Sequence, residues 1–231
     1  MPNPVIIAHR GASAEAPENT LAGFQRAIAL KADGIELDVQ ITRDGVAVVF
    51  HDDSLRRLTG KTGRLTAKTW PELKLLRVLG SDQGIPRLTD VLAQTRGRVV
   101  VQIELKRGAR VAPILSAIRQ ARAVSWVILA SFEADLVREA ADLAPRIPRM
   151  LISEGRRSPE VILRQLAESK AVGISVDYRA VRRPEFIKYF QDMGFTVWCW
   201  TVNDARTAKR LIGWEADGLL GDNPALLRGL I

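Results

Sequence analysis

The sequence contains almost no cysteine and very little histidine. Among its 231 residues there are one cysteine, Cys199, and two histidines, His9 and His51. A single cysteine excludes an internal disulfide and a zinc site built from cysteines, and we expect Cys199 to be buried and unreactive. Two histidines leave few candidates for a side chain that titrates near neutral pH.

Long apolar runs are also absent, although 47% of the residues are hydrophobic. No segment approaches the about 20 apolar residues of a membrane helix. The N-terminal sequence MPNPVIIAHRG lacks the basic segment and apolar segment of a secretory signal. We therefore expect a cytoplasmic protein with a sizeable core and no stable membrane insertion, present as a monomer or homodimer.

The formal net charge is +8 and the pI is about 10.1. The basic residues are scattered, and they are not interleaved with aromatics as in grooves that bind nucleic acid strands. The pattern therefore argues against nucleic acid as a partner. It fits either ordinary solvated surface charge or a small anionic substrate.

Short apolar segments alternate with segments of helical periodicity along the whole chain. The expected strands are residues 5–9, 34–39, 46–51, 99–105, 126–131, 148–152, 172–176, 195–201 and 217–221. The expected helices are residues 19–31, 88–95, 111–121, 133–143, 159–168, 184–193, 204–213 and 223–230. Helix starts are indicated at Asn19, Thr89, Ser158, Asn203 and Asn223.

This alternation predicts a parallel sheet covered by helices. Eight strand–helix units in 231 residues fit an α/β protein with a closed (β/α)₈ TIM barrel, formed as one domain by residues 1–231. An open doubly wound sheet is the alternative. Asp44-Gly45 predicts a hairpin after the second strand, and residues 53–87 form a long connection that we interpret as a small insertion at the barrel mouth.

Charged residues interrupt two of the expected strands. Side-chain alternation places Glu36 and Asp38 on one face of the second strand, and Glu104 and Lys106 on one face of segment 99–106. Neighbouring carboxylates in a dry interior need a countercharge, and their oxygens suit a hard divalent cation. Glu36, Asp38 and Glu104 are therefore candidate metal ligands, with salt-bridged strand ends as the alternative. Lys106 could contact a phosphate or neutralise one of these carboxylates.

Each histidine ends an apolar strand, in VIIAH for His9 and VAVVFH for His51. Histidine suits general acid–base catalysis near neutral pH. Arg10 offers a planar fork for a phosphate, and Gly11 allows the backbone to turn. The C-terminal ends of strands carry the active sites of (β/α)₈ barrels, so this set of side chains predicts phosphodiester cleavage.

Aromatic residues end two further strands. Trp200, in the segment WCWTV, is either a core aromatic or a wall that packs against the carbon skeleton of a polar substrate. Phe132 could have the same role.

Several segments resemble, in order, the motifs of the glycerophosphodiester phosphodiesterase family. They are HRGASAEAPENTLAGF (9–24), DGIELDVQITRDGVAVVFHDDSLRRLTG (33–60), IPRLTDVL (85–92), IELK (103–106), WTVN (200–203) and DGLLGDNP (217–224). The resemblance spans essentially the whole chain. It implies a (β/α)₈ barrel with an insertion after the second strand, a bound Mg²⁺ or Ca²⁺, and hydrolysis of glycerophosphodiesters to sn-glycerol 3-phosphate and an alcohol.

The resemblance also implies a role for individual residues. His9 and His51 match the general acid and base, with His51 favoured as the base, and the nucleophile is either water or the glycerol 2-hydroxyl. Glu36, Asp38 and Glu104 match the metal ligands, Arg10 and Lys106 the phosphate contacts, and Trp200 a substrate-lining position. One departure is Gly221, where the family often has a hydroxyl residue, so no side-chain contact with substrate is expected there.

Two other functions share this scaffold. A phospholipase D-like barrel enzyme acting on lysophospholipid or sphingomyelin would need an apolar platform for acyl chains. Apolar residues of the 53–87 segment could supply that platform or could anchor the segment to the barrel; these are Leu73, Leu75, Leu76, Val78 and Leu79. A non-catalytic binding barrel is the second alternative, but it would have no need of both histidines.

Overall fold

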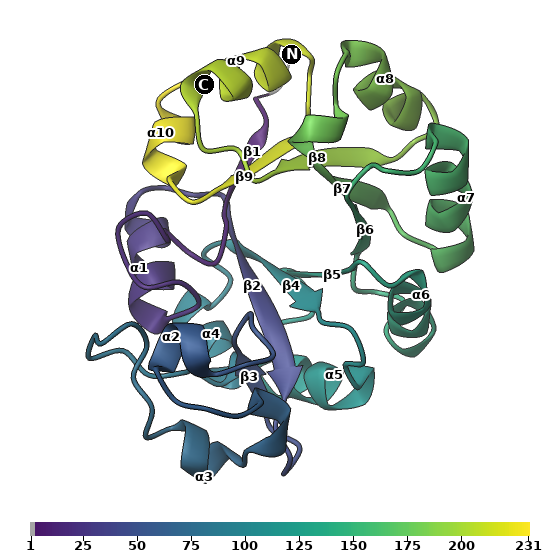
Figure 1. Ribbon diagram of the computed structural model, residues 1–231. Helices are drawn as coiled ribbons and strands as arrows, with labels where there is room; N and C mark the ends of the chain where they lie inside the picture. Colours follow the sequence, from purple (N-terminus) through teal and green to yellow (C-terminus); the bar gives the residue numbers. More distant parts are fainter. Residues whose placement is uncertain (1–2) are drawn as a thin grey trace.

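The computed structural model describes residues 3–231, and eight parallel strands form a closed barrel (Figure 1). The strands are β1 (Val5–Ala8), β2 (Gly34–Ile41), β4 (Val100–Leu105), β5 (Val127–Ser131), β6 (Arg149–Ser153), β7 (Gly173–Asp177), β8 (Thr196–Trp200) and β9 (Gly218–Gly221). Because β1 pairs with both β2 and β9, the sheet has no open edge between its first and last parallel strands. The predicted (β/α)₈ barrel is confirmed, and the open sheet is wrong.

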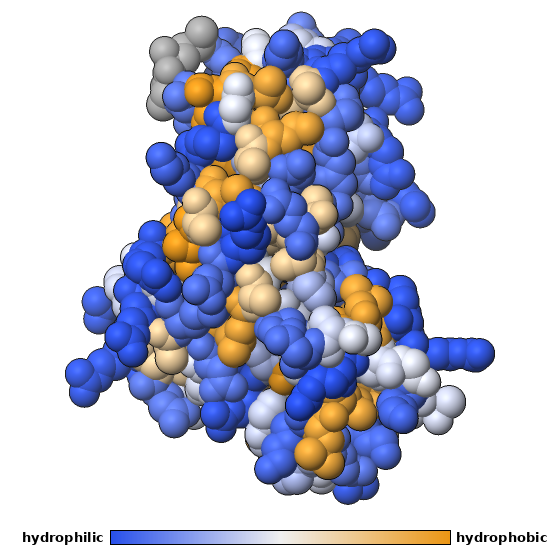
Figure 2. Space-filling view, turned by 90° about the vertical axis from the view of Figure 1, so that its left-hand side faces the viewer, coloured by the Kyte–Doolittle hydropathy of each residue, from blue (hydrophilic) through white to orange (hydrophobic). Residues whose placement is uncertain are grey.

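Helices form a ring outside the barrel (Figure 1). They are α1 (Leu21–Ala29), α4 (Leu88–Thr95), α5 (Val111–Gln120), α6 (Ala134–Leu143), α7 (Pro159–Ser169), α8 (Pro184–Asp192), α9 (Ala205–Gly213) and α10 (Pro224–Arg228), with a 3₁₀ turn, η2 (Tyr178–Ala180), before α8. Within residues 3–231, every helix is too short or too polar to cross a membrane. Figure 2 shows one face of the molecule, where polar side chains separate several apolar patches.

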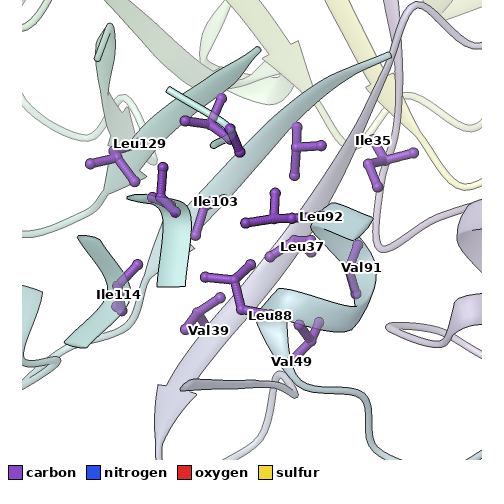
Figure 3. Close-up of a cluster of buried hydrophobic side chains, with 14 of the residues drawn as sticks. Ile35, Leu37, Val39, Val49, Leu88, Val91, Leu92, Ile103, Ile114 and Leu129 are labelled. Carbon is purple, nitrogen blue, oxygen red and sulfur yellow. The ribbon is translucent and has the colours of Figure 1, made fainter. Parts of the chain in front are cut away.

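Side-chain alternation along the strands creates two apolar layers. Outward residues such as Leu37 and Ile103 join Leu88 and Leu92 of α4 in a buried cluster (Figure 3). Each such leucine or isoleucine contributes about 1.5–3 kcal/mol when it is fully buried. A separate cluster that includes Ile7, Met150, Trp198 and Leu220 occupies inward positions. The outward faces therefore stabilise the barrel, and inward positions near its mouth are available for polar residues.

Cys199 belongs to the outer apolar layer of the second half of the barrel, which includes residues of β6 to β9 and of the helices that cover them. It is buried, as the sequence predicted. Burial raises the pKa of its thiol to about 12, so the reactive thiolate is scarce at neutral pH.

The predicted hairpin is confirmed. Strand β3 (Ala47–Val49) pairs antiparallel with β2, with Val39 opposite Val49 and Ile41 opposite Ala47. Gly45 has a φ of +87°, a conformation that glycine adopts without steric cost.

The segment between β3 and α4 is folded. It contains α2 (Arg56–Thr59), η1 (Leu65–Ala67) and α3 (Trp70–Leu73), and it has its own buried cluster. Leu73 and Val78 lie inside this cluster and Leu76 packs against it. Leu75 and Leu79 are 71% and 56% exposed. Three of the five apolar residues considered for a lipid platform therefore anchor the segment instead.

Three of the expected helix starts are wrong. Thr20, with extended backbone, caps α1, whereas Asn19 has a φ of +56°, outside the extended region that an N-cap adopts. Asp204, not Asn203, caps α9 by accepting from the Thr207 amide. Thr89 lies inside the first turn of α4, which begins at Leu88.

The other two expected starts are confirmed as N-cap residues. Ser158 precedes Pro159 at the start of α7, although its side chain makes no capping hydrogen bond. Asn223 precedes Pro224 in α10 and accepts from the Leu226 amide. Proline at the first helical position fits both helices, since its missing N–H would have no intrahelical partner there.

Candidate active site

The predicted site residues gather around one cavity of about 160 Å³ at the C-terminal ends of the strands. The predicted residues that line it are His9, Arg10, Glu36, His51, Glu104, Lys106 and Trp200, and Phe132 lines it too. Asp38 lies behind this lining, with 1% of its surface exposed. Residues between His9 and Lys106 are thus folded so that the polar residues at the ends of their strands meet at one cavity.

Three carboxylates form a compact cluster. Glu36 and Asp38 lie on β2, and the strand register places Glu104 of β4 directly opposite Asp38. One oxygen from each of the three lies within 4.8 Å of the others. Burial, followed by the charge of Asp38, raises the pKa of Glu36 to about 8 and also raises the pKa of Glu104. The raised pKa values of Glu36 and Glu104 show that these two carboxylates are incompletely neutralised, and the three residues supply hard oxygen donors, so the cluster fits a divalent cation.

Two basic side chains already approach Asp38. The Nζ atom of Lys106 is 3.2 Å from Asp38 Oδ1 and 2.7 Å from Glu104 Oε1. The Nε atom of Arg10 is 3.4 Å from Asp38 Oδ2. Burial raises the pKa of Asp38, but the charges of Lys106 and Arg10 outweigh burial and hold that pKa below its usual value. Asn19 donates from Nδ2 to Asp38 Oδ2 at 2.8 Å, a contact that the sequence did not reveal.

The chain turns sharply where β1 delivers Arg10 to the cavity. Arg10 and Gly11 have φ values of +57° and +85°. A Cβ atom on Gly11 would lie 2.7 Å from the carbonyl carbon of Gly23, so only glycine fits. The Arg10 amide donates to Glu36 Oε2 at 3.0 Å, and its Nη1 donates to Glu18 Oε1 at 2.9 Å. These contacts fix the guanidinium at the cavity wall.

A carboxylate from the far end of the chain orients His9. Its Nδ1 lies 2.7 Å from Asp222 Oδ1. Asn203 holds Asp222 in turn, because its Nδ2 donates to Oδ2 at 2.5 Å and its Oδ1 accepts from the Asp222 amide at 2.9 Å. Asp222 follows an apolar strand just as His9 does, so the same signal could have identified it.

His51 is oriented by its sequence neighbour. Its Nδ1 lies 2.7 Å from Asp52 Oδ1. Arg57 of α2 donates to both oxygens of Asp52 at 2.7 and 2.8 Å, and to both oxygens of Glu18 at 2.6 and 2.9 Å. Since Glu18 also holds Arg10, one arginine of the 53–87 segment connects the supports of His51 and Arg10. No local sequence pattern predicts this connection.

The two histidines have opposite pKa shifts. Burial lowers the pKa of His9, but the hydrogen bond to Asp222 and the charge of Glu36 outweigh burial, so this pKa is raised. Burial also lowers the pKa of His51, and there the charges of Asp38 and the hydrogen bond to Asp52 do not compensate, so this pKa is lowered. His9 is therefore the more readily protonated of the two histidines and His51 the more readily neutral.

The opposite wall of the cavity is apolar. The rings of Phe132 and Trp200 meet edge to face, with centroids 5.8 Å apart and an interplanar angle of 82°. The Nε1 atom of Trp200 donates to the Ser175 carbonyl at 2.9 Å, which fixes the indole. A Cβ atom on Gly221 would clash with the Val202 carbonyl, so this position has no room for the hydroxyl residue seen in the resembling family.

Comparisons with known proteins agree with the geometry. The Glycerophosphoryl diester phosphodiesterase family matches residues 9–226. A glycerophosphodiester phosphodiesterase of Caldanaerobacter subterraneus is 33% identical over 241 residues, covering 98% of this chain and 97% of its own. The crystal structure of a glycerophosphodiester phosphodiesterase from Agrobacterium tumefaciens has a TM-score of 0.86 at 30% identity, covering 98% of this chain and 99% of its own.

A phosphodiesterase from Oleispira antarctica, solved in complex with the product sn-glycerol 3-phosphate, shares the fold with a TM-score of 0.89 at 24% identity. It covers 99% of this chain and 96% of its own. The extent of the family match and the identity of the relatives confirm the resemblance seen in the sequence. The chain belongs to the glycerophosphoryl diester phosphodiesterase family.

Proposed function

We propose that this chain hydrolyses glycerophosphodiesters to sn-glycerol 3-phosphate and an alcohol, with a divalent cation and two histidines. The observation that carries the proposal is that the chain's only two histidines face one cavity together with Glu36, Glu104, Arg10 and Lys106, and that Asp38 lies directly behind this lining within the carboxylate cluster. Membership of the family supports the reaction class. The residue roles rest on the geometry of this site.

Arg10 and Lys106 would bind the phosphate. Both line the cavity, and both carry N–H groups suited to phosphate oxygens. Glu36, Asp38 and Glu104 would hold the Mg²⁺ or Ca²⁺ ion. When bound, such an ion supplies positive charge that stabilises the developing charge on the phosphoryl oxygens. Glu18 and Glu36 keep the Arg10 guanidinium and backbone in place while the substrate binds.

The opposite pKa shifts support His9 as the acid and His51 as the base. Neutral His51 would accept the proton of the attacking hydroxyl, from water or from the glycerol C2 position. Protonated His9 would donate its proton to the oxygen of the departing alcohol. Asp222 and Asp52 each occupy the Nδ1 side of a ring, which directs both Nε2 atoms to the reaction. Pairs of groups whose environments separate their pKa values are typical of acid–base enzymes.

The arrangement of the chain is also part of the proposal. We expect residues 1–231 to work as one barrel domain in which residues 53–87 are an insertion. The shared hydrogen bonds of Arg57 with Glu18 and Asp52 support this view, because they join the insertion to the barrel at the site. A cytoplasmic location and a monomeric or homodimeric state stay predictions from the sequence.

The test is release of sn-glycerol 3-phosphate from glycerophosphocholine by the purified protein. We expect release with Mg²⁺ or Ca²⁺ and loss of release with a chelator, restored by excess metal. Folded protein that releases no product with either metal would contradict the proposed reaction. Release that persists unchanged in chelator would retain the reaction but contradict the role of the carboxylates.

A further inference from the structure

The 53–87 segment carries most of the protein's positive charge. It contains eight basic and three acidic residues, a formal net charge of +5, whereas the whole chain has a net charge of +8. Four of its basic residues are exposed and form no ion pair within residues 3–231; they are Arg56, Lys61, Lys74 and Arg77. An excess of positive charge on one part of a surface attracts an anionic partner.

The same segment exposes apolar side chains that its own folding does not explain. Leu75 and Leu79 are the two most exposed large apolar residues of the described chain, and neither belongs to the buried cluster of the segment. Leu79 also has a φ of +50°, a left-handed conformation that is unfavourable for a leucine. Unusual backbone conformations that persist in a fold are often found where a protein binds something.

The unpaired cations lie beside these leucines. Leu75 directly follows Lys74, and Arg77 is two residues from each leucine. The Leu79 amide donates to the Leu58 carbonyl of α2 at 2.6 Å, and α2 carries another of the unpaired arginines. In the lower part of Figure 2, at the height of α2 and α3 in Figure 1, apolar patches lie among hydrophilic side chains. Charge and apolar surface therefore occur together in this segment.

This combination fits the surface of an anionic lipid bilayer. Leucine side chains enter the boundary between the head groups and the acyl chains, and nearby lysines and arginines contact the anionic head groups. The long side chains of lysine and arginine can keep their charge in water while their carbon atoms cover apolar surface. A nucleic acid would match the charge through its phosphates but would not require the leucines.

We propose that the 53–87 segment docks the protein reversibly on an anionic lipid surface through Leu75, Leu79 and the unpaired cations beside them. This docking surface is distinct from the catalytic cavity, because none of its residues lines that cavity. Arg57 of the same segment holds Asp52, the support of His51, so docking brings the proposed active site close to the lipid. The inference goes beyond the proposed function, since lipid binding requires no hydrolysis.

The test is cosedimentation of the purified full chain with lipid vesicles. One set of vesicles is phosphatidylcholine alone, and the other is an equimolar mixture of phosphatidylcholine and phosphatidylglycerol. We expect binding to the mixed vesicles at low salt, much weaker binding to phosphatidylcholine alone, and a loss of binding as salt screens the charges. Binding to neither kind of vesicle at low salt, or equal binding to both, would overturn the proposal.

Two double variants separate the charge from the apolar contribution. Lys74→Gln with Arg77→Gln should weaken binding to the mixed vesicles by roughly 10- to 30-fold, the usual effect of two cations near an anionic lipid surface. Leu75→Ser with Leu79→Ser should weaken it by roughly tenfold, because the apolar contact with the lipid is lost, and should leave the salt dependence intact. All four side chains are exposed, so each variant should fold normally.

Matched controls change the same properties elsewhere on the surface. Arg206→Gln with Lys209→Gln removes two exposed, unpaired cations of α9 and changes the net charge by the same amount. Leu143→Ser with Met193→Ser removes two other exposed apolar side chains. We expect both controls to bind the mixed vesicles as the unaltered protein does. Equal weakening by the α9 control and the Lys74 and Arg77 pair would show that overall charge, not this segment, binds the lipid.

The remaining outcomes are also distinguishable. If the leucine pair leaves binding unchanged while the lysine and arginine pair weakens it, the segment is a general polyanion site and lipid docking is overturned; a duplex DNA oligonucleotide should then compete with the vesicles. Hydrolysis of glycerophosphocholine in solution, measured for every variant, should stay unchanged because the docking surface lies outside the cavity. A protein that binds the vesicles but hydrolyses no substrate would contradict the proposed function and leave the docking surface standing.

Discussion

The first half of the barrel carries the charge of the site, and the second half carries its apolar surface. Strands β1, β2 and β4 and the segment after β3 position the histidines, carboxylates, Arg10 and Lys106. Strands β5 to β9 contribute uncharged residues to the cavity lining, namely Phe132, Ile152, Ser175, Trp200 and Leu220. The outward strand faces are apolar in both halves. Both halves therefore contribute to the buried core, whereas the proposed chemistry is concentrated in one half.

One residue breaks this division. Asp222 follows β9 in the second half and supports His9 at 2.7 Å, while His51 is supported by Asp52 beside it in the sequence. The first histidine thus depends on closure of the barrel between β9 and β1, and the second does not. Substitutions in the two halves can test how strictly the charged and the apolar contributions to the site are separated.

The largest effect is expected for the histidines. His9→Ala and His51→Ala should each lower kcat for glycerophosphocholine by roughly 10²–10⁴-fold, the usual contribution of general acid–base catalysis. Trp200→Ala, on the apolar wall, should act mainly on KM, since it removes packing and no proton transfer. Product release assays with melting curves for each variant make the comparison. Near-normal kcat in both folded histidine variants would refute the two-histidine mechanism.

A smaller effect is expected for the carboxylates behind the histidines. Asp222→Asn removes a contribution that raises the pKa of His9, so that pKa falls. The acid must be protonated to act. We therefore expect the alkaline limb of the pH–activity profile to shift to lower pH. Asp52→Asn lowers the pKa of His51 in the same way. Because the base must be neutral to act, we expect the acidic limb of the profile to shift to lower pH.

The measurement is kcat/KM against pH at saturating metal. At neutral pH we expect Asp222→Asn to lose roughly 10- to 100-fold, as is typical when an orienting partner is lost, and Asp52→Asn to lose less. An unchanged pH profile in Asp222→Asn would show that His9 is not the acid. Asp204→Asn is a control, because Asp204 caps α9 and lies outside the cavity lining.

Arg57 tests whether the 53–87 segment contributes to the site. Arg57→Gln removes the charge that joins Asp52 to Glu18, and we expect a loss of roughly tenfold in kcat/KM, of the size found for coupled neighbours. Arg57→Lys restores the charge but not the paired hydrogen bonds, so rescue should be partial. Arg64→Gln is the control in the same segment, since Arg64 forms a long, exposed ion pair with Asp53 and lies outside the cavity lining. Equal activity of all three variants would mean that the segment is not coupled to the site.

The smallest effect is expected for the exposed leucines of the segment. Replacing Leu75 and Leu79 by serine should change the free energy of unfolding by no more than about 0.5 kcal/mol each and should leave hydrolysis of glycerophosphocholine unchanged. Leu73→Ala, at a buried position, should cost about 2–5 kcal/mol. Hydrolysis of lysophospholipid vesicles that depends on Leu75 and Leu79 would instead favour the phospholipase D-like alternative.

Helix starts show where local reasoning failed. The local pattern predicts helix caps at Asn19 and Asn203, but both side chains bond to carboxylates of the site, Asp38 and Asp222. An asparagine can adopt positive φ or bond to a distant group as readily as it can cap a helix. The neighbouring Thr20 and Asp204 are equally good caps, so the local sequence does not distinguish the two roles.

Local patterns in the chain were enough to predict the barrel and the charged residues at its strand ends. A two-residue period fixes which side chains share a strand face, and parallel strands end at one edge, so Glu36, Asp38 and Glu104 had to converge. The hydrogen-bond partners of the site residues, in contrast, come from distant parts of the chain and follow only from the three-dimensional fold. Asp222 reaches His9 across 213 positions, and Arg57 joins Glu18 across 39. The unpaired state of Gln102 Oε1 likewise depends on the surrounding strands, so no local pattern encodes it.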